Sequence, residues 1–531
     1  MKGIAIPIWK QLEATPKPVL DCEHHTIMIV GGGPVGLTLA LDLGLKGQKV
    51  VLINQLDHIP GGSKGICYSK RTLDIWNRMD VAKPMLAKGV AWNKGKVFRG
   101  TSHQPIYAFD LMEKGDQEMP AFINLQQYHV EAILIDKLSR MENVDLRWGH
   151  CLTDTVPDAN GVEISVETGA GSYHARCDWL IACDGSKSSI RELLGLDFAG
   201  RVFEDNFLIA DIRMKGDRAA ERWFWFDPPF NPGRSALLHR QPDDIWRLDF
   251  QLGRDVDRKA AVLPENVDPL IRGMLGPDVA YEPVWYSLYT FQCRRMERFV
   301  HGRVLFAGDA AHLVSPFGAR GANGGIADAD NLGWKLDRVI RGEAPHSLIE
   351  SYNAEAITIA DENILNSTRA TDFISPKSAA SRAMRDAVLD LATAQDFARP
   401  FVNSGRLSNA VPLGQGGLQT PDCPKADWQG GIAPGWPAAD AKTRSGWLLA
   451  KLGGLFTLLS NGQSPAVDGC TQLDMTGEDQ VCAAFDLAPG DACLIRPDQI
   501  VAARWRGPDA QQIRAALSSA IGSGQRDRSW Q

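Results

Sequence analysis

The stretch TIMIVGGGPVG, residues 26–36, decides the fold of this chain. It is a run of β-branched and apolar residues that ends abruptly in glycines, and residues 37–46 continue with the spacing of a helix. A second apolar run follows at residues 49–53. Both runs are apolar on either face, which is typical of strands buried inside a parallel sheet. The sequence therefore predicts a βαβ unit and an α/β fold.

The glycines of this turn have the spacing G-x-G-x-x-G. Gly31 permits a tight turn, Gly33 lets the backbone approach a pyrophosphate, and Gly36 lets the helix pack closely on the strand. Pro34 stands between them, and the N–H groups of the helix that begins here face the bound anion. Such a turn can also be purely structural, but its place inside a βαβ unit favours dinucleotide binding.

The second strand of such a unit usually ends in an acidic residue that binds the ribose of the nucleotide. This chain has Asn54 at that position. An amide both donates to and accepts from a hydroxyl group, so the ribose contact can survive without a charge. The alternative is that Asp57 or a water molecule takes this role.

Two further apolar runs, residues 179–183 and 303–307, also end in turn-forming pairs. The first is followed by Asp184-Gly185 and the second by Gly308-Asp309. Asp309, at a strand end, is placed to hold a ribityl or ribose hydroxyl. Because the carboxyl ends of parallel strands meet at one edge of a sheet, the three strand ends predict a single ligand crevice along that edge.

A glycine-dense loop at residues 316–325 opens the next helix. The free N–H groups near residues 321–324 form a positive end that suits an anionic ring. Such a loop can also be merely flexible. Two glycine signals of this kind, both after buried strands, nevertheless fit one extended cofactor better than coincidence.

The composition is that of an ordinary globular protein. The 531 residues include 57 Lys plus Arg against 64 Asp plus Glu, a net charge of -7 that argues against a nucleic-acid partner. The ten cysteines contain no CxxC pair, so neither thioredoxin-type redox chemistry nor a structural metal site is expected. Residues 1–18 and 447–459 are too short or too interrupted for a signal or a membrane span, and we expect a cytoplasmic protein.

A second kind of pattern separates these strands. Apolar residues alternate with polar or aromatic ones, which predicts a half-buried antiparallel sheet inserted into the first domain. After residue 370, a helical stretch at 377–391 leads through a Gly- and Pro-rich segment at 411–437 to a final small unit with strands at 454–460 and 492–495. The inserted strands are expected at residues 203–211, 222–227, 235–240, 245–252 and 284–292.

Three motifs together resemble a known family. They are the glycine turn at residues 31–36, Cys183-Asp184-Gly185 with Ser189-Ile190-Arg191, and the segment from Gly308-Asp309 through Asn331-Leu332. In order and spacing they resemble the fingerprints of the single-component FAD-dependent aromatic hydroxylases, the group that includes p-hydroxybenzoate hydroxylase and phenol hydroxylase. The resemblance covers about residues 25–370.

The resemblance implies an α/β chain with a Rossmann-like FAD-binding domain, an inserted antiparallel β-sheet domain for the substrate, and a C-terminal thioredoxin-like domain without CxxC. Arg496-Pro497-Asp498 with Arg504 resembles the closing strand of that tail. The tail is then structural or an oligomer contact, and a homodimer is possible. The implied boundaries are 1–24 for an N-terminal extension, 25–95, 125–195 and 298–370 for the FAD-binding domain, 96–124 and 196–297 for the substrate-binding domain, 371–410 for a helical connector and 411–531 for the C-terminal domain.

The same resemblance implies FAD as cofactor and NADH or NADPH as co-substrate. Gln127, in a Gln-x-x-x-Glu helix, is expected to reach the ribityl side, and Asp184 to serve both FAD and NAD(P)H. Lys64 stands where the family usually has Arg, and Ala319-Arg320 replaces the usual Gly-Gln. The implied cofactor residues are Gly31, Gly33, Pro34, Gly36, Asn54, Ser63, Lys64, Gln127, Asp184, Gly185, Gly308, Asp309, Gly321, Ala322 and Asn323.

The activity implied is an NAD(P)H- and FAD-dependent monooxygenase of aromatic compound catabolism. It hydroxylates a phenolic or other electron-rich aromatic substrate with molecular oxygen through a flavin C4a-hydroperoxide. Two alternatives stay open, namely a flavin-dependent epoxidase or halogenase of the same fold and a non-catalytic FAD-binding sensor. The halogenase stretch Trp-x-Trp-x-Ile-Pro is absent, since Phe226-Asp227 follows Trp223-Phe224-Trp225.

The substrate residues are predicted from the inserted sheet. His239 and Tyr289 are the best candidates for contacts with the phenol, and Pro316 resembles the loop proline beside the reactive flavin carbon. Arg240 and Arg320, expected near the crevice, would suit a carboxylated or nitro-substituted phenol. Further candidates on or beside these strands are Trp223, Trp225, Phe230, Asp249, Gln251 and Tyr286, of which the two tryptophans are more typical of sheet packing; His312 is expected to be structural.

Overall fold

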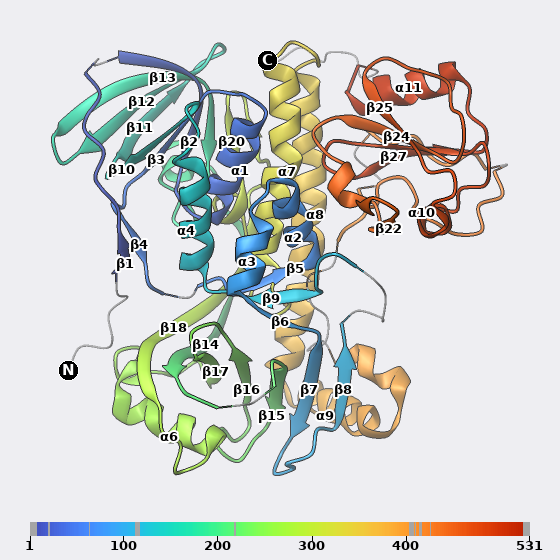
Figure 1. Cartoon of the computed structure of the whole chain (residues 1–531). Helices are drawn as coiled ribbons and strands as arrows, with labels where there is room; N and C mark the ends of the chain where they lie inside the picture. Colours follow the sequence, from blue (N-terminus) through green and yellow to red (C-terminus); the bar gives the residue numbers. More distant parts are fainter. Residues whose placement is uncertain are drawn as a thin grey trace.

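The computed structural model describes residues 8–19, 22–62, 64–111, 117–216, 219–402, 408, 410–413, 417–424 and 426–523. These residues form three lobes (Figure 1). A mixed sheet and helices make the first lobe, and an eight-stranded sheet lies below it. A smaller C-terminal unit packs beside the long helices α7 (Gly321–Ile340) and α8 (Ser347–Ile374). Ser63, one of the expected cofactor residues, lies outside the described residues.

The first lobe is built on a sheet with the strand order β10-β3-β2-β13-β12-β11. The predicted βαβ unit is confirmed, because β2 and β3 are parallel and α1 (Pro34–Leu45) connects them. Strand β20 pairs with β13 and with the short β19. The strands are β2 (Cys22–Val30), β3 (Val50–Asn54), β10 (Val144–Trp148), β11 (Cys151–Pro157), β12 (Val162–Thr168), β13 (Gly171–Ala182), β19 (Val300–His301) and β20 (Val304–Phe306).

Strands β2, β13 and β20 run parallel and end level with one another. Ala182 pairs with Val30 on one side and with Phe306 on the other. The backbone ladder continues one step further, since the N–H of Cys183 donates to Val30 at 2.8 Å and that of Ala307 donates to Ala182 at 3.1 Å. The three glycine-bearing turns therefore leave the sheet at the same edge, as the sequence predicts.

Helix α1 packs between α7 and α4 (Gln127–Leu138). The approach of α1 to α7 is close, because a Cβ atom on Gly333 would meet Oδ2 of Asp42 at 2.0 Å. Small elements surround this core. They are β1 (Ile8–Gln11) paired with β4 (His58–Pro60), the sheet of β5 (Cys67–Ser69), β9 (Phe122–Asn124) and β6 (Val90–Trp92), the helices α2 (Lys70–Arg78), α3 (Ala82–Lys88) and α5 (Ser189–Leu193), and the turn η2 (Gly308–Ala310).

The second lobe is a sheet with the order β21-β18-β14-β17-β16-β15-β7-β8. The expected inserted strands are all present. One feature differs from the expected antiparallel sheet, because β15 pairs in parallel with β7, which comes from an earlier part of the chain. The strands are β7 (Lys94–Arg99), β8 (Tyr107–Asp110), β14 (Ala199–Arg213), β15 (Arg222–Phe226), β16 (Ser235–Arg240), β17 (Ile245–Gly253), β18 (Glu282–Arg295) and β21 (His312–Leu313).

This sheet is buried on both faces rather than half-buried. Helix α6 (Pro264–Leu275), which follows the turn η1 (Ala260–Val262), packs on one face. Helix α9 (Ala379–Ala394), the turn η3 (Asp396–Phe401) and the end of α8 pack on part of the other. The sequence pattern missed this burial because it placed residues 371–410 in a helical connector rather than against the sheet.

The C-terminal unit has a four-stranded sheet with the order β25-β24-β26-β27, in which only β24 and β25 are parallel. It docks on α7 and α8 through buried charges. Arg496 forms two hydrogen bonds with Glu355, at 2.6 and 2.9 Å, and Lys335 donates to Glu355 at 2.7 Å. The elements are β22 (Lys442–Thr443), β23 (Gly446–Trp447), η5 (Leu449–Lys451), β24 (Phe456–Ser460), β25 (Cys470–Asp474), α10 (Asp479–Phe485), β26 (Ala492–Ile495), β27 (Val501–Trp505) and α11 (Ala510–Ala520).

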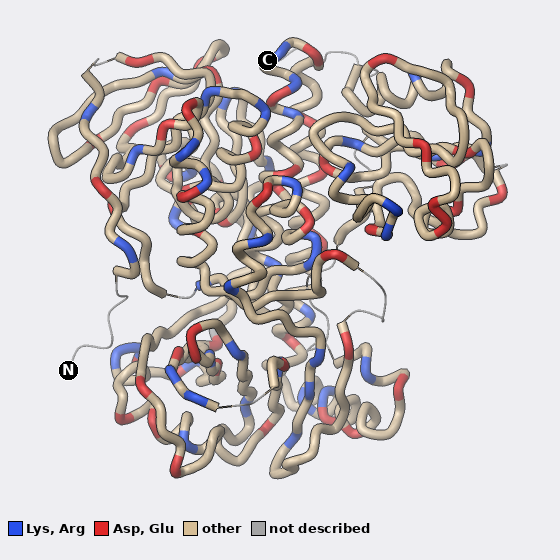
Figure 2. Tube along the Cα trace, viewed as in Figure 1, with Lys and Arg blue, Asp and Glu red and all other residues tan. Residues whose placement is uncertain are grey.

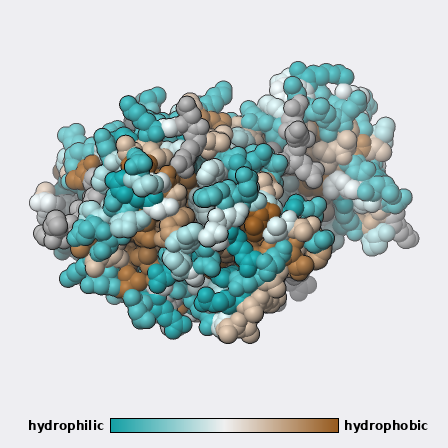
Figure 3. Space-filling model, turned by 90° about the horizontal axis from the view of Figure 1, so that it is seen from below, coloured by the Kyte–Doolittle hydropathy of each residue, from teal (hydrophilic) through white to brown (hydrophobic). Residues whose placement is uncertain are grey.

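The surface carries both signs of charge. Lys and Arg are interspersed with Asp and Glu over all three lobes (Figure 2). Seen from below, the molecule is mainly hydrophilic, with apolar residues in small scattered patches (Figure 3). No helix formed by the described residues has both the length and the apolar character needed to cross a membrane.

Candidate functional site

The glycine turn after β2 has the geometry that an anion site needs. Gly31 has φ +116°, and a Cβ atom there would meet the carbonyl oxygen of Cys183 at 2.2 Å. A Cβ atom on Gly36 would meet the oxygen of Gly31 at 2.1 Å, whereas one on Gly33 would find no atom within 4 Å. Pro34 opens α1, whose N-cap Gly33 offers no side-chain acceptor. The space beside Gly33 is thus open next to the first N–H groups of α1, which have no acceptor within the helix.

Asn54 stabilises this turn. Its Oδ1 accepts from the N–H of Gly32 at 3.0 Å, and its Nδ2 donates to the carbonyl of Leu56 at 3.0 Å. One lone pair of Oδ1 is left for a ribose hydroxyl. Asp57 accepts from His58 at 3.0 Å and lies beside the N-terminal segment, whose Leu12 N–H donates to its carbonyl at 2.7 Å.

The Asp184-Gly185 pair follows β13 at the same edge. Oδ2 of Asp184 accepts from the N–H of Ile190 at 3.2 Å and from the hydroxyl of Ser189 at 3.3 Å. Its Oδ1 is buried and has no partner among the described residues. Burial raises the pKa of Asp184, against the hydrogen bonds of its own turn. Gly185 has φ +84° and open space around it.

The Gly308-Asp309 turn is held by Asp328, which also forms a buried ion pair with His312. Asp328 accepts from His312 at 2.6 Å and from the N–H of Gly308 at 3.0 Å, so His312 is structural as expected. The Asp309 side chain is exposed, and no described residue forms a hydrogen bond or ion pair with its carboxylate. Burial nevertheless raises its pKa, while His312 and Lys64 act against that shift. A carboxylate that is surrounded by protein yet open on one side suits a hydroxyl ligand.

A second polar group lies near Asp309 and consists of Lys64, Gln127 and Glu131. Gln127 accepts from the N–H of Gly65 at 3.1 Å and donates to Glu131 at 2.7 Å. Glu131 is buried, and burial raises its pKa to about 7 although Gln127 and Lys64 act in the opposite direction. A Cβ atom on Gly65 would lie 3.8 Å from Ala322, which places this group against the start of α7.

The start of α7 is tied to β5. Oδ1 of Asn323 accepts from the N–H of Ser69 at 2.9 Å and from the hydroxyl of Thr72 at 2.6 Å, and Nδ2 donates to Cys67 at 3.1 Å. The Asn323 side chain therefore fixes the backbone, and the N–H groups of Gly321 and Ala322 are what this helix end presents to a ligand.

Pro316 lies exposed in the loop before α7 and accepts from the N–H of Ala319 at 3.0 Å. Ala319 has φ +53°, an uncommon value for a residue with a side chain. Next to it, Phe317 is buried against Phe207 and Phe291 of the sheet lobe, with ring centroids 5.2 and 5.3 Å away. The loop therefore connects the second sheet to the edge of the first sheet at which β2, β13 and β20 end. We call this edge the cofactor edge, because the three motifs expected to hold the cofactor meet there.

One face of the second sheet turns toward this loop, and we call it the inner face. Tyr289 of β18 lies on it and is 44% exposed. Burial and the charge of Asp309 raise the pKa of Tyr289, whereas Arg247 acts in the opposite direction. The Tyr289 hydroxyl thus lies between the cofactor edge and the inner face.

A row of buried polar residues crosses the inner face. Arg247 pairs with His239 on β16 and with Asp211 on β14, and Asp211 pairs with Trp285. Arg222 of β15 continues the row beside His239. Trp223 pairs with Leu238, and in this antiparallel pair the residue before Trp223 lies beside the residue after Leu238. We call Arg222, His239, Arg247, Asp211 and Trp285 the polar row; each is at most 6% exposed.

The polar row faces β5 of the first lobe. Cys67 of that strand feels the charges of Arg222 and Arg247, while burial raises its pKa to about 11. Burial and the charges of the same two arginines hold the pKa of His239 well below its usual value. His239 is therefore a neutral imidazole at neutral pH, and its Nδ1 is buried without a partner in the described part of the chain.

The expected place of Arg240 is wrong, and the side chain of Arg320 is bound within the fold. The guanidinium of Arg240 lies 5.8 Å from the ring centre of Trp246, on the face that α6 covers. That of Arg320 is buried and donates to Asn363 of α8 at 3.1 Å. Neither residue places a cation on the inner face. Strand alternation puts Arg240 on the opposite face, and the side chain of Arg320 is hydrogen-bonded to α8.

Sequence reasoning missed Arg222 and Arg247. Arg247 precedes Asp249 by two residues, so both point to the same face, and Nε of Arg247 donates to Asp249 at 3.1 Å. The signal was available in part, since the expected packing of Trp223 and Trp225 on one face puts Arg222 on the other. That packing is confirmed by the stacking of Trp225 on Phe98 at 5.1 Å.

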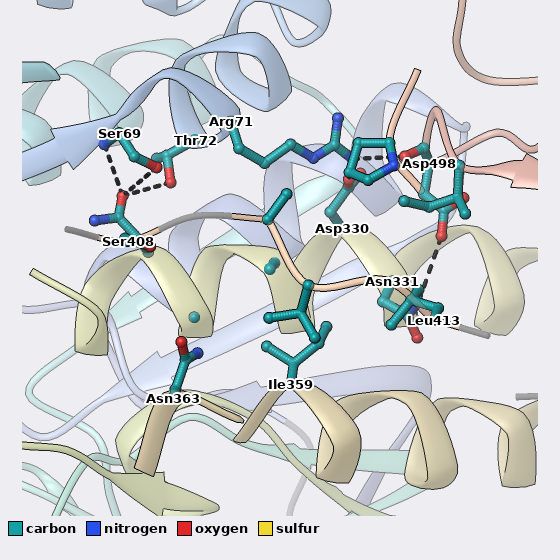
Figure 4. A pocket seen from close by; sticks show the side chains of 17 residues that line it. Ser69, Arg71, Thr72, Asp330, Asn331, Ile359, Asn363, Ser408, Leu413 and Asp498 are labelled. Carbon is teal, nitrogen blue, oxygen red and sulfur yellow. Dashed lines mark hydrogen bonds and ion pairs between the residues drawn. The ribbon is translucent and has the colours of Figure 1, made fainter. Parts of the chain in front are cut away.

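A small cavity of about 70 Å³ lies away from these residues, between α2, α7, α8 and the C-terminal unit (Figure 4). Its polar groups bind one another. Arg71 pairs with Asp330 at 2.9 Å, and Asn331 donates to Asp498 at 3.4 Å. A neighbouring cavity of about 420 Å³ shares Ser69 and Arg71 with it. Among the described residues, no cluster of three metal-ligand side chains occurs.

Comparison with known proteins shows the family to which the chain belongs. The family described as FAD binding domain matches residues 24–367. A 12-dehydrotetracycline 5-monooxygenase/anhydrotetracycline 6-monooxygenase of Streptomyces rimosus is 30% identical over 382 residues, 69% of this chain and 73% of that protein. A 3-(3-hydroxy-phenyl)propionate/3-hydroxycinnamic acid hydroxylase of Mycobacterium sp. is 26% identical over 95% of this chain and 93% of that protein.

Solved structures share the fold. The flavin-dependent monooxygenase PieE, in complex with FAD and substrate, superposes with a TM-score of 0.79 at 22% identity, over 95% of this chain and 100% of that one. The OxyS anhydrotetracycline hydroxylase from Streptomyces rimosus gives 0.70 at 25% identity, over 94% and 99%.

Proposed function

Since the chain belongs to the FAD-binding-domain family of flavoprotein aromatic hydroxylases, we propose that it binds FAD along the edge where β2, β13 and β20 end, and hydroxylates a phenol held between that edge and the inner face. It is an FAD- and NAD(P)H-dependent aromatic monooxygenase. The observation that carries the assignment of the site is the level ending of these three strands, because it brings the three motifs of the sequence to one place.

The residues at this edge fit FAD. Open space before Gly33 and at the start of α1 suits a pyrophosphate, and the carboxylate of Asp309, open on one side, suits a ribityl hydroxyl. The charge of Lys64 acts on both Asp309 and Glu131, and Gln127 fixes the backbone at Gly65. The other proposed contacts are Pro34, Gly36, Asn54, Ser63, Asp184, Gly185, Gly308, Gly321, Ala322 and Asn323, with Asn54 and Asn323 acting mainly through the backbone that they hold.

The bound flavin supplies the activation of oxygen and the acceptance of hydride from NAD(P)H. The chain supplies the rest. We assign to His239 a hydrogen bond to the phenolic oxygen, since its imidazole stays neutral and its Nδ1 has no partner among the described residues. Tyr289 lies on the inner face and feels the charge of Asp309, and its hydroxyl orients the phenol by donating a hydrogen bond to it. Pro316 holds the turn beside the ring, and the buried aromatic residues around Phe317 exclude water.

The relatives narrow the substrate. One acts on tetracycline intermediates and another on 3-(3-hydroxy-phenyl)propionate, both hydroxylated aromatic compounds. We propose a small hydroxylated aromatic compound for this chain as well, in an aromatic catabolic route and in the cytoplasm.

The C-terminal unit is proposed to be thioredoxin-like. Its strand order β25-β24-β26-β27, with one parallel pair and α10 and α11 placed after β25 and β27, supports this assignment. Its buried docking on α7 and α8 supports a structural role, and a homodimer through this or another surface remains a proposal.

The test of the proposed function is turnover of a phenol panel by the purified protein. Yellow protein should oxidise NADH or NADPH faster when the right phenol is added, consume oxygen and release hydroxylated product. Peroxide must be measured in parallel, because uncoupled oxidation mimics turnover. Chloride-dependent product would point to a halogenase, an epoxide product to an epoxidase, and bound FAD without nicotinamide oxidation to a sensor.

A further inference from the structure

The polar row contains one buried cation that the protein does not pair. Arg222 is 6% exposed, and its Nε has no hydrogen-bond partner among the residues that the structure describes. No carboxylate forms an ion pair with it in the described ranges. A buried guanidinium without a counterion costs several kcal/mol of folding free energy, so a stable fold retains it only where something else binds it.

The nearby carboxylates serve the other arginine. Asp249 forms an ion pair with Arg247 at 3.1 Å, and the charge of Asp211 acts on Arg247 as well. Asp249 acts on Arg222 only from a distance. Two carboxylates therefore gather around Arg247, and the donors of Arg222 are left pointing into the inner face.

The groups beside Arg222 are donors or neutral. His239 carries no charge, and the thiol of Cys67, which feels the charge of Arg222, is neutral because burial raises its pKa to about 11. Neighbouring strands are about 4.8 Å apart, so the positions from Arg222 to Arg247 span about 10 Å. This is the length of a substituted benzene ring, and a surplus of donors over that length selects an acceptor that carries negative charge.

We propose that Arg222 binds an anionic oxygen group of the aromatic substrate, a carboxylate or an ionised hydroxyl, with the ring of His239 beside it. Arg222 is thus the specificity residue that Arg240 and Arg320 do not provide. The inference rests on the proposed function, and it restricts the substrate to acidic aromatic compounds. A planar guanidinium suits this role because it donates two parallel hydrogen bonds to one carboxylate.

The experiment compares acids with their amides on the FAD-loaded protein. The pairs are 3-hydroxybenzoate with 3-hydroxybenzamide, and 3-(3-hydroxyphenyl)propionate with its amide. A third pair, 4-nitrophenolate and 4-nitroanisole above the ionisation of the phenol, separates an ionised hydroxyl from a carboxylate. Ligand binding is measured as the change in flavin absorbance during titration, which requires no turnover.

Wild-type protein should bind at least one anion about tenfold or more tightly than its neutral partner. In Arg222→Gln that anion should lose about ten- to a hundredfold in affinity, the worth of a hydrogen bond to a charged group, while the neutral partner changes little. Arg222→Lys should fall between the two because it keeps the charge but not the fork. Arg213→Gln is the matched control, since Arg213 is an exposed arginine of the same sheet that pairs with Glu282.

Three results overturn the inference: no binding of any anion by the wild type, equal affinity for anion and neutral partner, or equal loss of both in Arg222→Gln. The flavin spectrum of each variant shows whether it has folded around FAD. Hydroxylation of neutral phenols without preference for acids refutes this inference and leaves the proposed function. Binding of acids through Arg222 without oxygenation of any ring refutes the function and leaves the inference.

Discussion

Two clusters of buried charge differ in one respect. At the docking surface of the C-terminal unit, Lys335, Glu355 and Arg496 are 0% exposed, and each is hydrogen-bonded to another charged side chain. Arg496 also donates to Asp498 at 2.9 Å. On the inner face, Arg222 is nearly as buried, yet its guanidinium meets no counterion among the described residues.

The difference separates fold from function. In the docking cluster the protein supplies both partners, and the two carboxylates of Glu355 and Asp498 match the two cations. At the inner face it supplies only one, so the second must come from a ligand. An unpaired polar group in a native interior is therefore a better guide to a binding site than a paired one.

Breaking the docking cluster should give the largest effect. Arg496→Met leaves Glu355 with only Lys335 and leaves Asp498 without its cation, so the protein should lose about 3–5 kcal/mol of stability. The measurement is urea unfolding followed by tryptophan fluorescence. Arg140→Met is the control, because this exposed arginine pairs only with Asp136 on the surface of α4 and should change stability by less than about 0.5 kcal/mol. An unchanged urea midpoint in Arg496→Met would show that the cluster is not needed for docking.

Glu131 is an intermediate case, a buried carboxyl with one donor, Gln127. Its pKa is about 7 in the folded chain against 4.5 in the unfolded one. Between these values the unfolded chain has released a proton that the folded chain still binds, so stability falls as the pH rises through this window. The loss should reach about 3 kcal/mol in the FAD-depleted protein.

The same urea experiment at several pH values tests this. The wild type should lose stability between about pH 4.5 and 7 relative to Glu131→Gln. This substitution removes the titrating carboxyl group but keeps an oxygen that accepts the hydrogen bond from Gln127. Parallel curves for the two proteins across that window would contradict the assignment.

The fold follows from short stretches of sequence. The glycine-tipped runs before Gly31, Asp184 and Gly308 each predict a strand that ends at the ligand edge, because turn chemistry is local. The level ending of the three strands, with Val30, Ala182 and Phe306 side by side, then follows from parallel pairing. The edge at which the three glycine-bearing turns meet was for this reason predictable from local sequence.

The inner face was not predictable in the same way. Which side of β16 carries His239 rather than Arg240 depends on the register of its pairing with β15 and β17, and a shift of one residue exchanges the faces. The burial of the sheet under α9 depends on a helix 130 or more residues later in the chain than β16. The pairing of Glu355 with Arg496 joins residues 141 apart.

Asp309 extends the comparison to the cofactor edge, since no described residue forms a hydrogen bond or ion pair with its carboxylate either. Asp309→Ala should weaken FAD binding by about ten- to a hundredfold, the worth of a hydrogen bond to a carboxylate. FAD retained after dialysis, read from the absorbance of the protein, measures this. Asp309→Asn should keep part of the affinity because the amide still accepts. A fully yellow Asp309→Ala protein would place the ribityl chain elsewhere.

The smallest and sharpest effect is expected at Arg222. Arg222→Met removes a buried charge that has no partner, so the ligand-free protein should be unchanged or more stable by about 1 kcal/mol. The same substitution thus has opposite signs in the two clusters, destabilising at Arg496 and neutral or stabilising at Arg222, and both are read from urea unfolding. Because the two side chains are equally large and almost equally buried, a difference in packing does not explain opposite signs. If Arg222→Met instead destabilises the ligand-free protein as much as Arg496→Met does, Arg222 is paired within the fold and the contrast between the two clusters disappears.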